Sequence, residues 1–399
     1  VRSRGLGDVY KRQIGTVLFD SVTFRNCVCL GLVLGKDGAR MSKSRGTAVD
    51  PWILFEKYGS DATRWYMYSI VAPGDNIRFF EESVEDVYKR FLNTLWNAYS
   101  FYVTYALIDE YDPKEGRLQV EERSALDRWM ISRLNSLIRN VRAYMDAYEV
   151  HTATRAIEEF VTNEVSNWYV RRSRRRFWKL EKDKDKKAAY DTLTEVMDAV
   201  SRLLAPFMPF ISEEIYTNVF EEESVHFCEY PEVDESRIDK ELELLMEKAV
   251  AASEAGRAAR ADAGMKLRQP LVKAVVISDE PLDSVVPLIQ DELNVKNLEV
   301  KPTSSELLNF SVKLNYKNAG PKFKQKIRKV EEALGKENPR NVVETLKRDG
   351  KIQIVVDSEQ VVLEDEDLTV RTEVTEGYTS GESKNVTVFV ETTLTDALI

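Results

Sequence analysis

Five stretches with helical periodicity follow one another through the middle of the chain, and this succession constrains the fold more than any other feature. Apolar residues recur there at spacings of three and four, over 83–107, 124–148, 150–179, 187–204 and 209–220. An amphipathic helix must cover its apolar face with a neighbour, so consecutive stretches of this kind favour packing against one another. The pattern predicts an all-α helical bundle over 79–230.

The hydrophobic period changes in the last third of the chain. A long helix rich in Ala, Glu, Lys and Leu is expected over 241–263, ending at Gly264, within a linker over 231–264. Beyond it, β-branched runs alternate with shorter helical stretches. The runs lie at 272–277, 298–300, 307–316, 352–356, 361–372 and 386–391, and the helices at 285–293, 322–334 and 342–348. This alternation predicts a small α+β module over 265–399.

Composition narrows the class of protein. The chain has 399 residues, 43% of them hydrophobic, which is enough for two or three domains. It has neither the roughly 18 consecutive apolar residues of a membrane helix nor an apolar signal-peptide core, so we expect a cytoplasmic protein without a membrane partner. Three cysteines and two histidines have no zinc-site spacing, and no metal site is predicted. Cys27 and Cys29 alternate in an apolar strand, where we expect them to be buried.

A glycine-rich, cationic loop runs from Gly35 to Gly46. It separates an apolar strand expected over 26–34 from a helix that begins at Asp50-Pro51, an N-cap followed by proline. Glycines let a backbone approach oxyanions, while serines, N–H groups and lysines donate to them. The loop is therefore predicted to bind phosphate. Tyr58-Gly59 indicates the helix end, and Ser60-Asp61 is expected to cap a second helix.

A second basic feature lies within the bundle. Between Trp168 and Lys187 there are ten basic residues, five Arg and five Lys, and three acidic ones, on a chain whose net charge is −10. At about 100° per residue, the arginines at 171, 172, 175 and 176 share one broad helix face. Guanidinium groups suit phosphate oxygens and aromatic rings suit unstacked bases, so RNA is the expected partner. The alternative is a solvated helix whose aromatic residues pack in the core.

These motifs together resemble a known family. The loop, the segment Asp50-Pro51-Trp52 and the residues over 57–66 resemble the class I aminoacyl-tRNA synthetases, and within them most closely the isoleucyl enzymes. The segment 167–178 resembles the helix after the catalytic domain of the isoleucyl enzymes, and 204–214 resembles the end of the family's anticodon-binding domain. The segments 257–271, 292–296 and 320–323 resemble the C-terminal region of the isoleucyl enzymes of the archaeal and eukaryotic-like type. The resemblance runs from about Ile14 to the end of the chain but covers only the rear part of the family's length. Residues 1–13 do not match and are expected to be a non-native leader.

The resemblance implies a role for each motif. Residues 14–78 correspond to the rear part of a Rossmann-like α/β catalytic domain, whose loop clamps ATP, with Mg²⁺, while isoleucine is activated to its adenylate for transfer to tRNA(Ile). Catalysis is assigned to Lys43 and Arg40, and ATP binding to Met41, Ser42, Lys43 and Ser44. Arg40 stands where the family usually has lysine, and Thr47 where it usually has asparagine. The bundle corresponds to the anticodon-binding domain, and tRNA contacts are assigned to Trp168, Arg171, Arg172, Arg175, Arg176 and Trp178.

The family's "HIGH" signature, its amino-acid pocket and its editing insertion would lie upstream of this sequence, so the piece alone is expected to be inactive.

Two alternatives to a catalytic isoleucyl enzyme remain open. The chain could be a non-catalytic tRNA-binding module derived from a synthetase. It could also be a relative of the valyl or leucyl enzymes.

Overall fold

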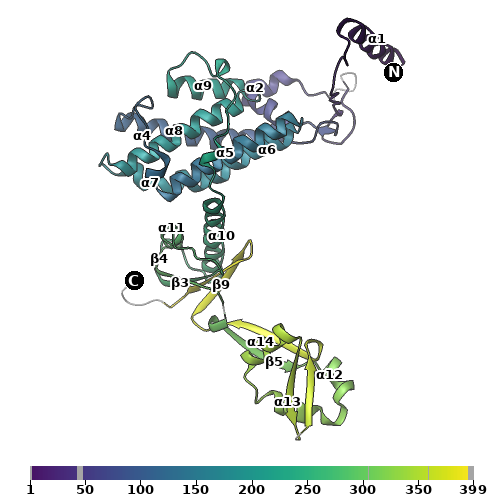
Figure 1. Ribbon diagram of the computed structural model, residues 1–399, viewed down its shortest axis with the longest axis vertical. Coiled ribbons are helices and arrows are strands. Elements are labelled where there is room, and N and C mark those ends of the chain that lie inside the picture. The colour runs from purple at the N-terminus through teal and green to yellow at the C-terminus, as the bar shows by residue number, and fades with distance from the viewer. Residues whose placement is uncertain (1, 43–47, 304, 358, 394–399) are drawn as a thin grey trace. The chain divides into compact units, whose positions relative to one another are not determined.

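The chain forms two compact units, residues 1–240 and 241–399, which are described separately (Figure 1). The computed structural model describes residues 2–42, 48–303, 305–357 and 359–393. Within these ranges, no helix combines the length and apolar character that a membrane span requires.

The first unit begins with a helix and a small parallel sheet. The elements are α1 (Arg2–Phe19), β1 (Val33–Leu34), α2 (Pro51–Ser69) and β2 (Ile77–Arg78). Val33 pairs with Ile77 in parallel register, so β1, α2 and β2 form a strand–helix–strand unit. The apolar strand expected over 26–34 is limited to its last two residues, because β2, itself two residues long, is its only strand partner in the described part of the chain. Cys27 and Cys29 are exposed, so the expectation that they are buried was wrong.

The helix after the loop begins and breaks where the sequence predicted. The Asp50 side chain accepts a 3.1 Å hydrogen bond from the N–H of Trp52, which makes it the N-cap of α2. Gly59, at φ 79° and ψ 159°, interrupts the helix. Asp61 was expected to cap the second half of α2 but does not, because its carboxylate accepts a 2.7 Å hydrogen bond from the N–H of Ile211. It therefore caps a helix much later in the chain.

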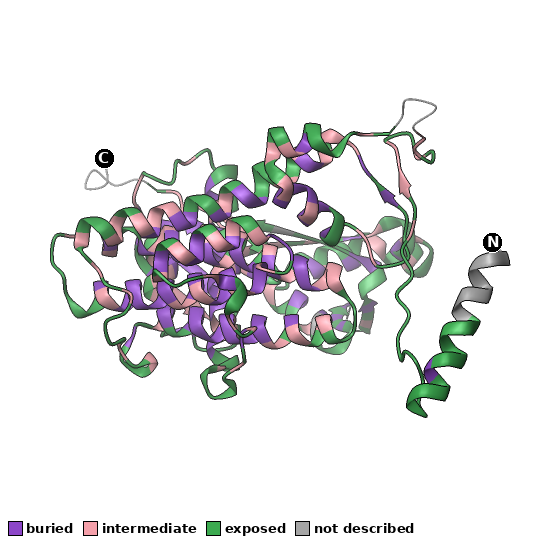
Figure 2. Cartoon of the chain, turned by 90° about the horizontal axis from the view of Figure 1, so that it is seen from above, coloured by how far each residue is buried: buried purple, intermediate pink, exposed green. Residues whose placement is uncertain are grey.

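The bundle follows with its predicted helical stretches. Its elements are α3 (Glu81–Val87), the π-helix η2 (Tyr88–Leu92), α4 (Asn93–Asp109), the 3₁₀ turn η3 (Val120–Glu122), α5 (Ala125–Asp146), α8 (Lys184–Leu204), α9 (Pro209–Phe220) and the 3₁₀ turns η5 (Val225–Phe227) and η6 (Glu235–Arg237). Buried residues gather between these helices, whereas residues 9–19 of α1 are almost all exposed (Figure 2). In the core, Trp65 of α2 stacks on Phe91 with ring centroids 4.4 Å apart. The loop-bearing segment and the bundle thus share one core.

The helix expected over 150–179 is divided into three parts. They are α6 (Val150–Glu159), the π-helix η4 (Phe160–Val170) and α7 (Arg171–Trp178). A π-helix has hydrogen bonds from i to i+5 and more residues per turn than an α-helix. It therefore changes which residues of α7 face the core.

The second unit has a four-stranded sheet covered by a helix. Its elements are α10 (Lys240–Asp262), β3 (Leu271–Ile277), α11 (Val286–Leu293), β4 (Val295–Lys301), β9 (Tyr378–Ser383) and β10 (Val386–Glu391). The strand order is β4-β3-β10-β9, with β3 and β4 parallel and the other pairs antiparallel. A Cβ on Gly381 of β9 would lie 2.1 Å from the carbonyl oxygen of Ala255 in α10. This close contact requires glycine.

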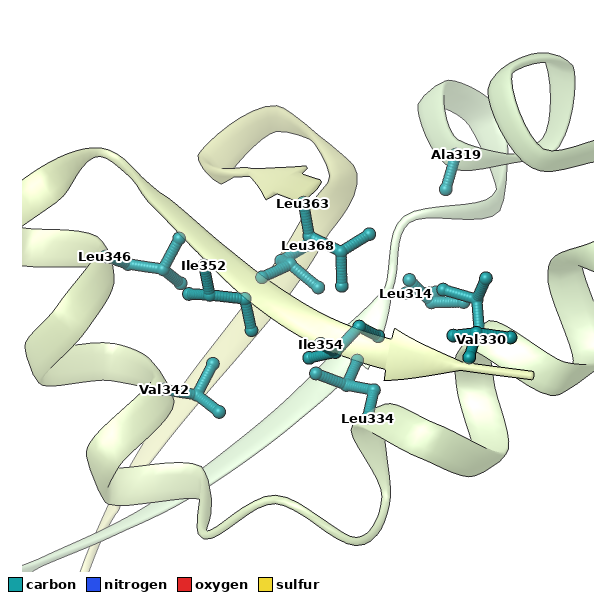
Figure 3. Close-up of a cluster of buried hydrophobic side chains, with 11 residues drawn as sticks. Leu314, Ala319, Val330, Leu334, Val342, Leu346, Ile352, Ile354, Leu363 and Leu368 are labelled. Carbon is teal, nitrogen blue, oxygen red and sulfur yellow. The ribbon is translucent and has the colours of Figure 1, made fainter. Parts of the chain in front are cut away.

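A second core in the same unit lies among shorter elements. These are the 3₁₀ turn η7 (Ser305–Leu307), β5 (Leu308–Leu314), α12 (Tyr316–Phe323), the 3₁₀ turn η8 (Lys324–Lys326), α13 (Ile327–Leu334), α14 (Pro339–Asp349), β6 (Lys351–Val356), β7 (Glu359–Glu364), the 3₁₀ turn η9 (Asp365–Asp367) and β8 (Leu368–Val374). β5 pairs with β8 and β6 pairs with β7. Leu334, Leu346, Ile354 and Leu363 point into the shared core (Figure 3). The run predicted as one strand over 361–372 is two strands, and β9 was not predicted.

Candidate nucleotide loop and nucleic-acid interface

The glycine-rich loop leaves the carboxyl end of β1. The N–H of Gly35 donates to the carbonyl of Ala39 at 2.8 Å, and that of Gly38 to the carbonyl of Gly35 at 2.9 Å. Gly38 has φ 77°, a conformation that favours glycine. The Asp37 side chain closes the turn by accepting from the N–H of Ala39. The loop therefore begins as a tight turn at the strand end, where α/β folds commonly bind their ligands.

The basic side chains around this turn differ in their contacts and exposure. Lys36 forms an ion pair with Glu82 at 2.7 Å and lies over the ring of Phe80. Arg40 is exposed. Arg78 of β2 is also exposed, and its guanidinium lies 3.6 Å from where a Cβ on Gly38 would be. Arg78 was not predicted as a site residue, since its place beside the loop follows only from the β1–β2 pairing.

The structure places only part of the predicted ATP-binding set. Met41 and Ser42 are half-buried after the turn. Lys43 and Ser44 lie outside the described residues, so their assignment stays a prediction. Arginine donors at a glycine turn are chemically suited to a polyanion such as a triphosphate. Within the described ranges, His, Cys, Asp and Glu side chains do not gather in groups of three or more that could hold a metal ion.

Helix α7 presents a cationic face to solvent. Arg174, Arg175 and Trp178 are exposed, and Arg171 is half-buried with its guanidinium 5.9 Å from the ring centroid of Trp168. These outward residues occupy positions i, i+3, i+4 and i+7 of one helix, which lie along a single stripe. The stripe combines three arginines with one exposed indole. We call Arg171, Arg174, Arg175 and Trp178 the outer face of α7.

The opposite side of α7 is fixed into the bundle. Arg176 donates to both carboxylate oxygens of Asp127, at 2.8 and 2.7 Å, and Asp127 has no exposed surface. The Tyr169 hydroxyl donates to the same carboxylate at 2.5 Å. Burial alone would lower the pKa of Arg176, but the hydrogen bond and negative charge of Asp127 outweigh it and hold that pKa above its ordinary value. The guanidinium of Arg176 is therefore a structural cation.

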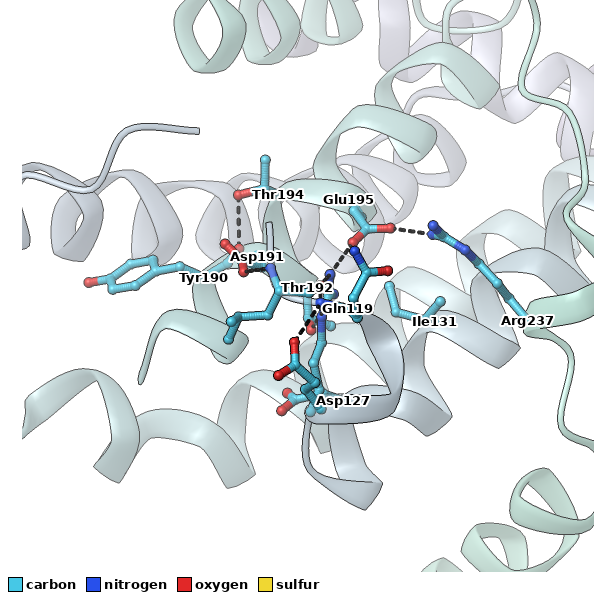
Figure 4. A network of polar contacts seen from close by, with 12 residues as sticks. Gln119, Asp127, Ile131, Tyr190, Asp191, Thr192, Thr194, Glu195 and Arg237 are labelled. Atoms are coloured by element: carbon cyan, nitrogen blue, oxygen red, sulfur yellow. Dashed lines mark hydrogen bonds and ion pairs between the residues drawn. The ribbon is translucent and has the colours of Figure 1, made fainter. Parts of the chain in front are cut away.

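A second polar network fixes α8 beside this site (Figure 4). Arg123, whose side chain is 2% exposed, donates to Glu195 at 2.7 Å and to Thr192 at 3.1 Å. Glu195 also accepts from Arg237 at 2.8 Å. The buried Asp191 accepts from the N–H of Leu118 at 2.8 Å. These bonds hold the segment before α5 against α8, so the helices that support α7 are fixed by polar as well as apolar contacts.

The predicted RNA-contacting residues therefore divide into two groups. Arg171, Arg175 and Trp178 lie on the outer face, whereas Trp168 is buried and Arg176 is paired with Asp127. Arg172 lies on the inward side and is half-buried. Arg174 belongs to the outer face but was not predicted, because the assumed face grouped 171 and 172 with 175 and 176. Ser173 and Phe177 are buried, and the residues that follow each of them, Arg174 and Trp178, are exposed. The small and apolar residues at 173 and 177 therefore indicate which side of α7 faces inward.

Comparisons with known proteins match the two regions of the chain that contain these residues. Residues 10–79 match the family model "tRNA synthetases class I (I, L, M and V)", and residues 127–277 match "Anticodon-binding domain of tRNA ligase". Two regions of the chain are thus similar to class I tRNA synthetases, and relatives of similar sequence match nearly all of it.

Those relatives are isoleucine–tRNA ligases. The chain is 40% identical over 391 residues to that of Clostridium tetani, and the match covers 96% of this chain and 38% of that protein. It is 37% identical over 397 residues to that of Thermus thermophilus, covering 97% of this chain and 38% of that protein. The chain thus spans less than two-fifths of the length of these relatives.

Proposed function

We propose that this chain is part of an isoleucine–tRNA ligase that activates isoleucine with ATP and transfers it to tRNA(Ile). The observation that carries the proposal is the match to these ligases over nearly the whole chain. The phosphate-suited turn after β1 and the cationic outer face of α7 support it independently, because each offers donors where an anionic substrate would need them. We place this enzyme in the cytoplasm.

The loop over 35–47 would hold the triphosphate of ATP. Arg40 and Lys43 would supply positive charge to the phosphates, and Met41, Ser42 and Ser44 would contribute to ATP binding. Mg²⁺ would enter with ATP, bound to the phosphate oxygens. Because charge builds up on the α-phosphate that the isoleucine carboxylate attacks and on the departing pyrophosphate, fixed cations lower the barrier without covalent chemistry. Arg78 is a further candidate for a phosphate contact, since it lies beside Gly38.

The outer face of α7 would bind tRNA. Its arginines suit phosphate oxygens, and Trp178, which is 56% exposed, suits stacking on an unpaired base. Trp168, predicted as a direct contact, would support Arg171 from below. Arg172 and Arg176 would act from the inward side, by holding the helix in place.

The proposal is tested with the longer protein that contains this chain. Isoleucine-dependent exchange between ATP and pyrophosphate, followed by charging of tRNA(Ile), is the expected result. The first alternative, a valyl or leucyl relative, predicts exchange with valine or leucine instead. The second, a non-catalytic tRNA-binding module, predicts tRNA binding with no exchange for any amino acid, and would refute the enzymatic proposal.

A further inference from the structure

A short turn in the second unit is held in an unusual way. The N–H of Gln269 donates to the carbonyl of Lys266 at 3.0 Å, so Lys266–Gln269 is a β-turn shortly after α10, which ends at Asp262. Two side chains hold the carbonyl groups of all four turn residues. Arg260 donates to the carbonyls of Lys266 and Gln269, and Asn294 donates to those of Leu267 and Arg268 at 3.0 and 3.1 Å.

The arginine behind the turn is buried without a carboxylate partner. Arg260 is 1% exposed, and it also donates a 3.1 Å hydrogen bond to the carbonyl of Leu293. Among the described residues, no carboxylate lies within ion-pair distance of it, and its Nε has no acceptor. The buried acid next to Leu293 is Glu292, which pairs with Arg257 at 2.6 Å instead. The positive charge of Arg260 is therefore not neutralised locally.

The outer side of the turn offers donors. Because the carbonyls point toward Arg260 and Asn294, the central N–H groups, those of Leu267 and Arg268, are turned away from them. Over the described ranges these two N–H groups have no acceptor, and neither do the side chains of Lys266 and Arg268, both exposed. Successive unpaired N–H groups in a turn form an anion-binding concavity. The cations of Lys266 and Arg268 flank the concavity of this turn, and that of Arg260 lies behind it.

We propose that the turn Lys266–Gln269 binds a backbone phosphate of RNA, as a second RNA contact separate from the outer face of α7. This inference rests on the proposed function, since it takes tRNA as the ligand. An RNA strand fits better than a small anion because Leu267, which is 39% exposed, lies between the two cations and can contact a base or ribose beside the phosphate.

The test measures binding of a tRNA(Ile) transcript to the full chain at several salt concentrations. The double variant Lys266→Gln/Arg268→Gln should bind about 10-fold more weakly, with a slope of affinity against salt that is shallower by about one to two units. The charge-matched control is Lys313→Gln/Lys317→Gln, which removes two exposed lysines of the same unit and should bind as the parent does. Unchanged binding of the first variant would overturn the inference.

A backbone variant tests the N–H donors themselves. Leu267→Pro removes the N–H at a turn position where proline is favoured, whereas Leu267→Ala keeps it. We expect the proline variant to bind several-fold more weakly than the alanine variant, with equal circular dichroism and melting temperature. Equal affinities in two folded variants would refute the N–H donors as phosphate contacts.

Two further experiments distinguish this inference from the proposed function and from binding of small phosphates. If Arg171→Gln/Arg174→Gln/Arg175→Gln weakens tRNA binding but the turn variants do not, the inference fails and the proposed function stands. If the parent chain does not bind tRNA(Ile), both the proposed function and this inference fail. Millimolar inorganic pyrophosphate at fixed ionic strength should leave tRNA affinity unchanged. A loss equal to that of the double variant would assign the turn to small phosphates and overturn the RNA assignment.

Discussion

The carboxylate of Asp61 accepts a 2.7 Å hydrogen bond from the backbone N–H of Ile211, a residue 150 positions further along the chain. Three residues after Asp61, Arg64 donates to the carbonyls of Pro206 and Phe207 at 2.9 and 2.8 Å. The helix that follows the nucleotide loop is thereby fixed to the start of α9. The two proposed functions of the first unit, nucleotide binding and tRNA binding, are built on one connected body.

Replacing Asp61 with alanine should destabilise the first unit by about 1–2 kcal/mol, since the partly buried N–H of Ile211 loses its acceptor. Urea unfolding followed by tryptophan fluorescence measures this. Asp61→Asn keeps an acceptor oxygen and should lose less than half as much. Equal losses in the two variants would mean that the negative charge, rather than the hydrogen bond, stabilises the start of α9.

Replacing the three arginines of the outer face, Arg171, Arg174 and Arg175, with glutamine should weaken tRNA(Ile) binding by about 10- to 100-fold. Each phosphate contact that is lost reduces the slope of log affinity against log salt by about 0.7–0.9. Anisotropy titrations of a labelled transcript at several salt concentrations give both values. An unchanged slope would show that these side chains do not contact phosphate.

Arg176→Gln should act on stability instead. It leaves the Asp127 carboxylate buried without its cation, which costs about 3–5 kcal/mol in other buried pairs. The double variant Arg176→Gln/Asp127→Asn removes the uncompensated charge and should recover part of the loss. Thermal unfolding of both variants measures the difference. No recovery in the double variant would contradict the ion pair as the reason for the loss.

Lys43→Ala in the longer protein should reduce ATP–pyrophosphate exchange by about 100-fold or more, as the loss of a transition-state cation does elsewhere. The affinity for tRNA(Ile) should remain close to that of the parent. Lys36→Ala is a matched control in the same loop, because Lys36 is paired with Glu82. Exchange at the parental rate in Lys43→Ala would remove the assigned role.

The stability of the first unit should fall as the pH rises from about 10 to 12. Burial raises the pKa of Tyr102 to about 12, although its hydrogen bond with Thr194 opposes the shift. The folded state thus holds this proton more tightly than the unfolded state, whose tyrosine pKa is about 10. The resulting stability, up to about 3 kcal/mol, is complete below pH 10 and is lost through pH 12. Tyr102→Phe should unfold with a shallower pH dependence in that window, and an identical dependence would contradict it.

Local signals in the sequence were sufficient for much of the fold. The N-cap at Asp50 and the break at Gly59 depend on side-chain and backbone preferences that act within a few residues. The helices of the bundle have apolar faces wide enough to be recognised from their period. These features need no knowledge of distant contacts.

The failed expectations depend on partners far along the chain. Asp61 was expected to cap its own helix, because its true partner, the N–H of Ile211 in α9, lies far away in the sequence. Cys27 and Cys29 follow a strand pattern, but burial needs neighbouring strands. The face of α7 was misassigned because the arginines were grouped by charge, whereas the burial of Ser173 and Phe177 determines which side of the helix faces inward. Arg176 could not be distinguished from Arg175 without Asp127.

The contact between Gly381 and Ala255 determines where the chain can be cut. Helix α10 belongs to the second unit from Glu241 onward, and its residues around 255 are pressed against β9 with no room for a side chain between them. A truncation that begins after Asp262 would remove the helix from the sheet it covers and leave an apolar surface open to aggregation. A truncation that begins at Glu241 keeps the helix with its sheet and is the better boundary for producing the second unit alone.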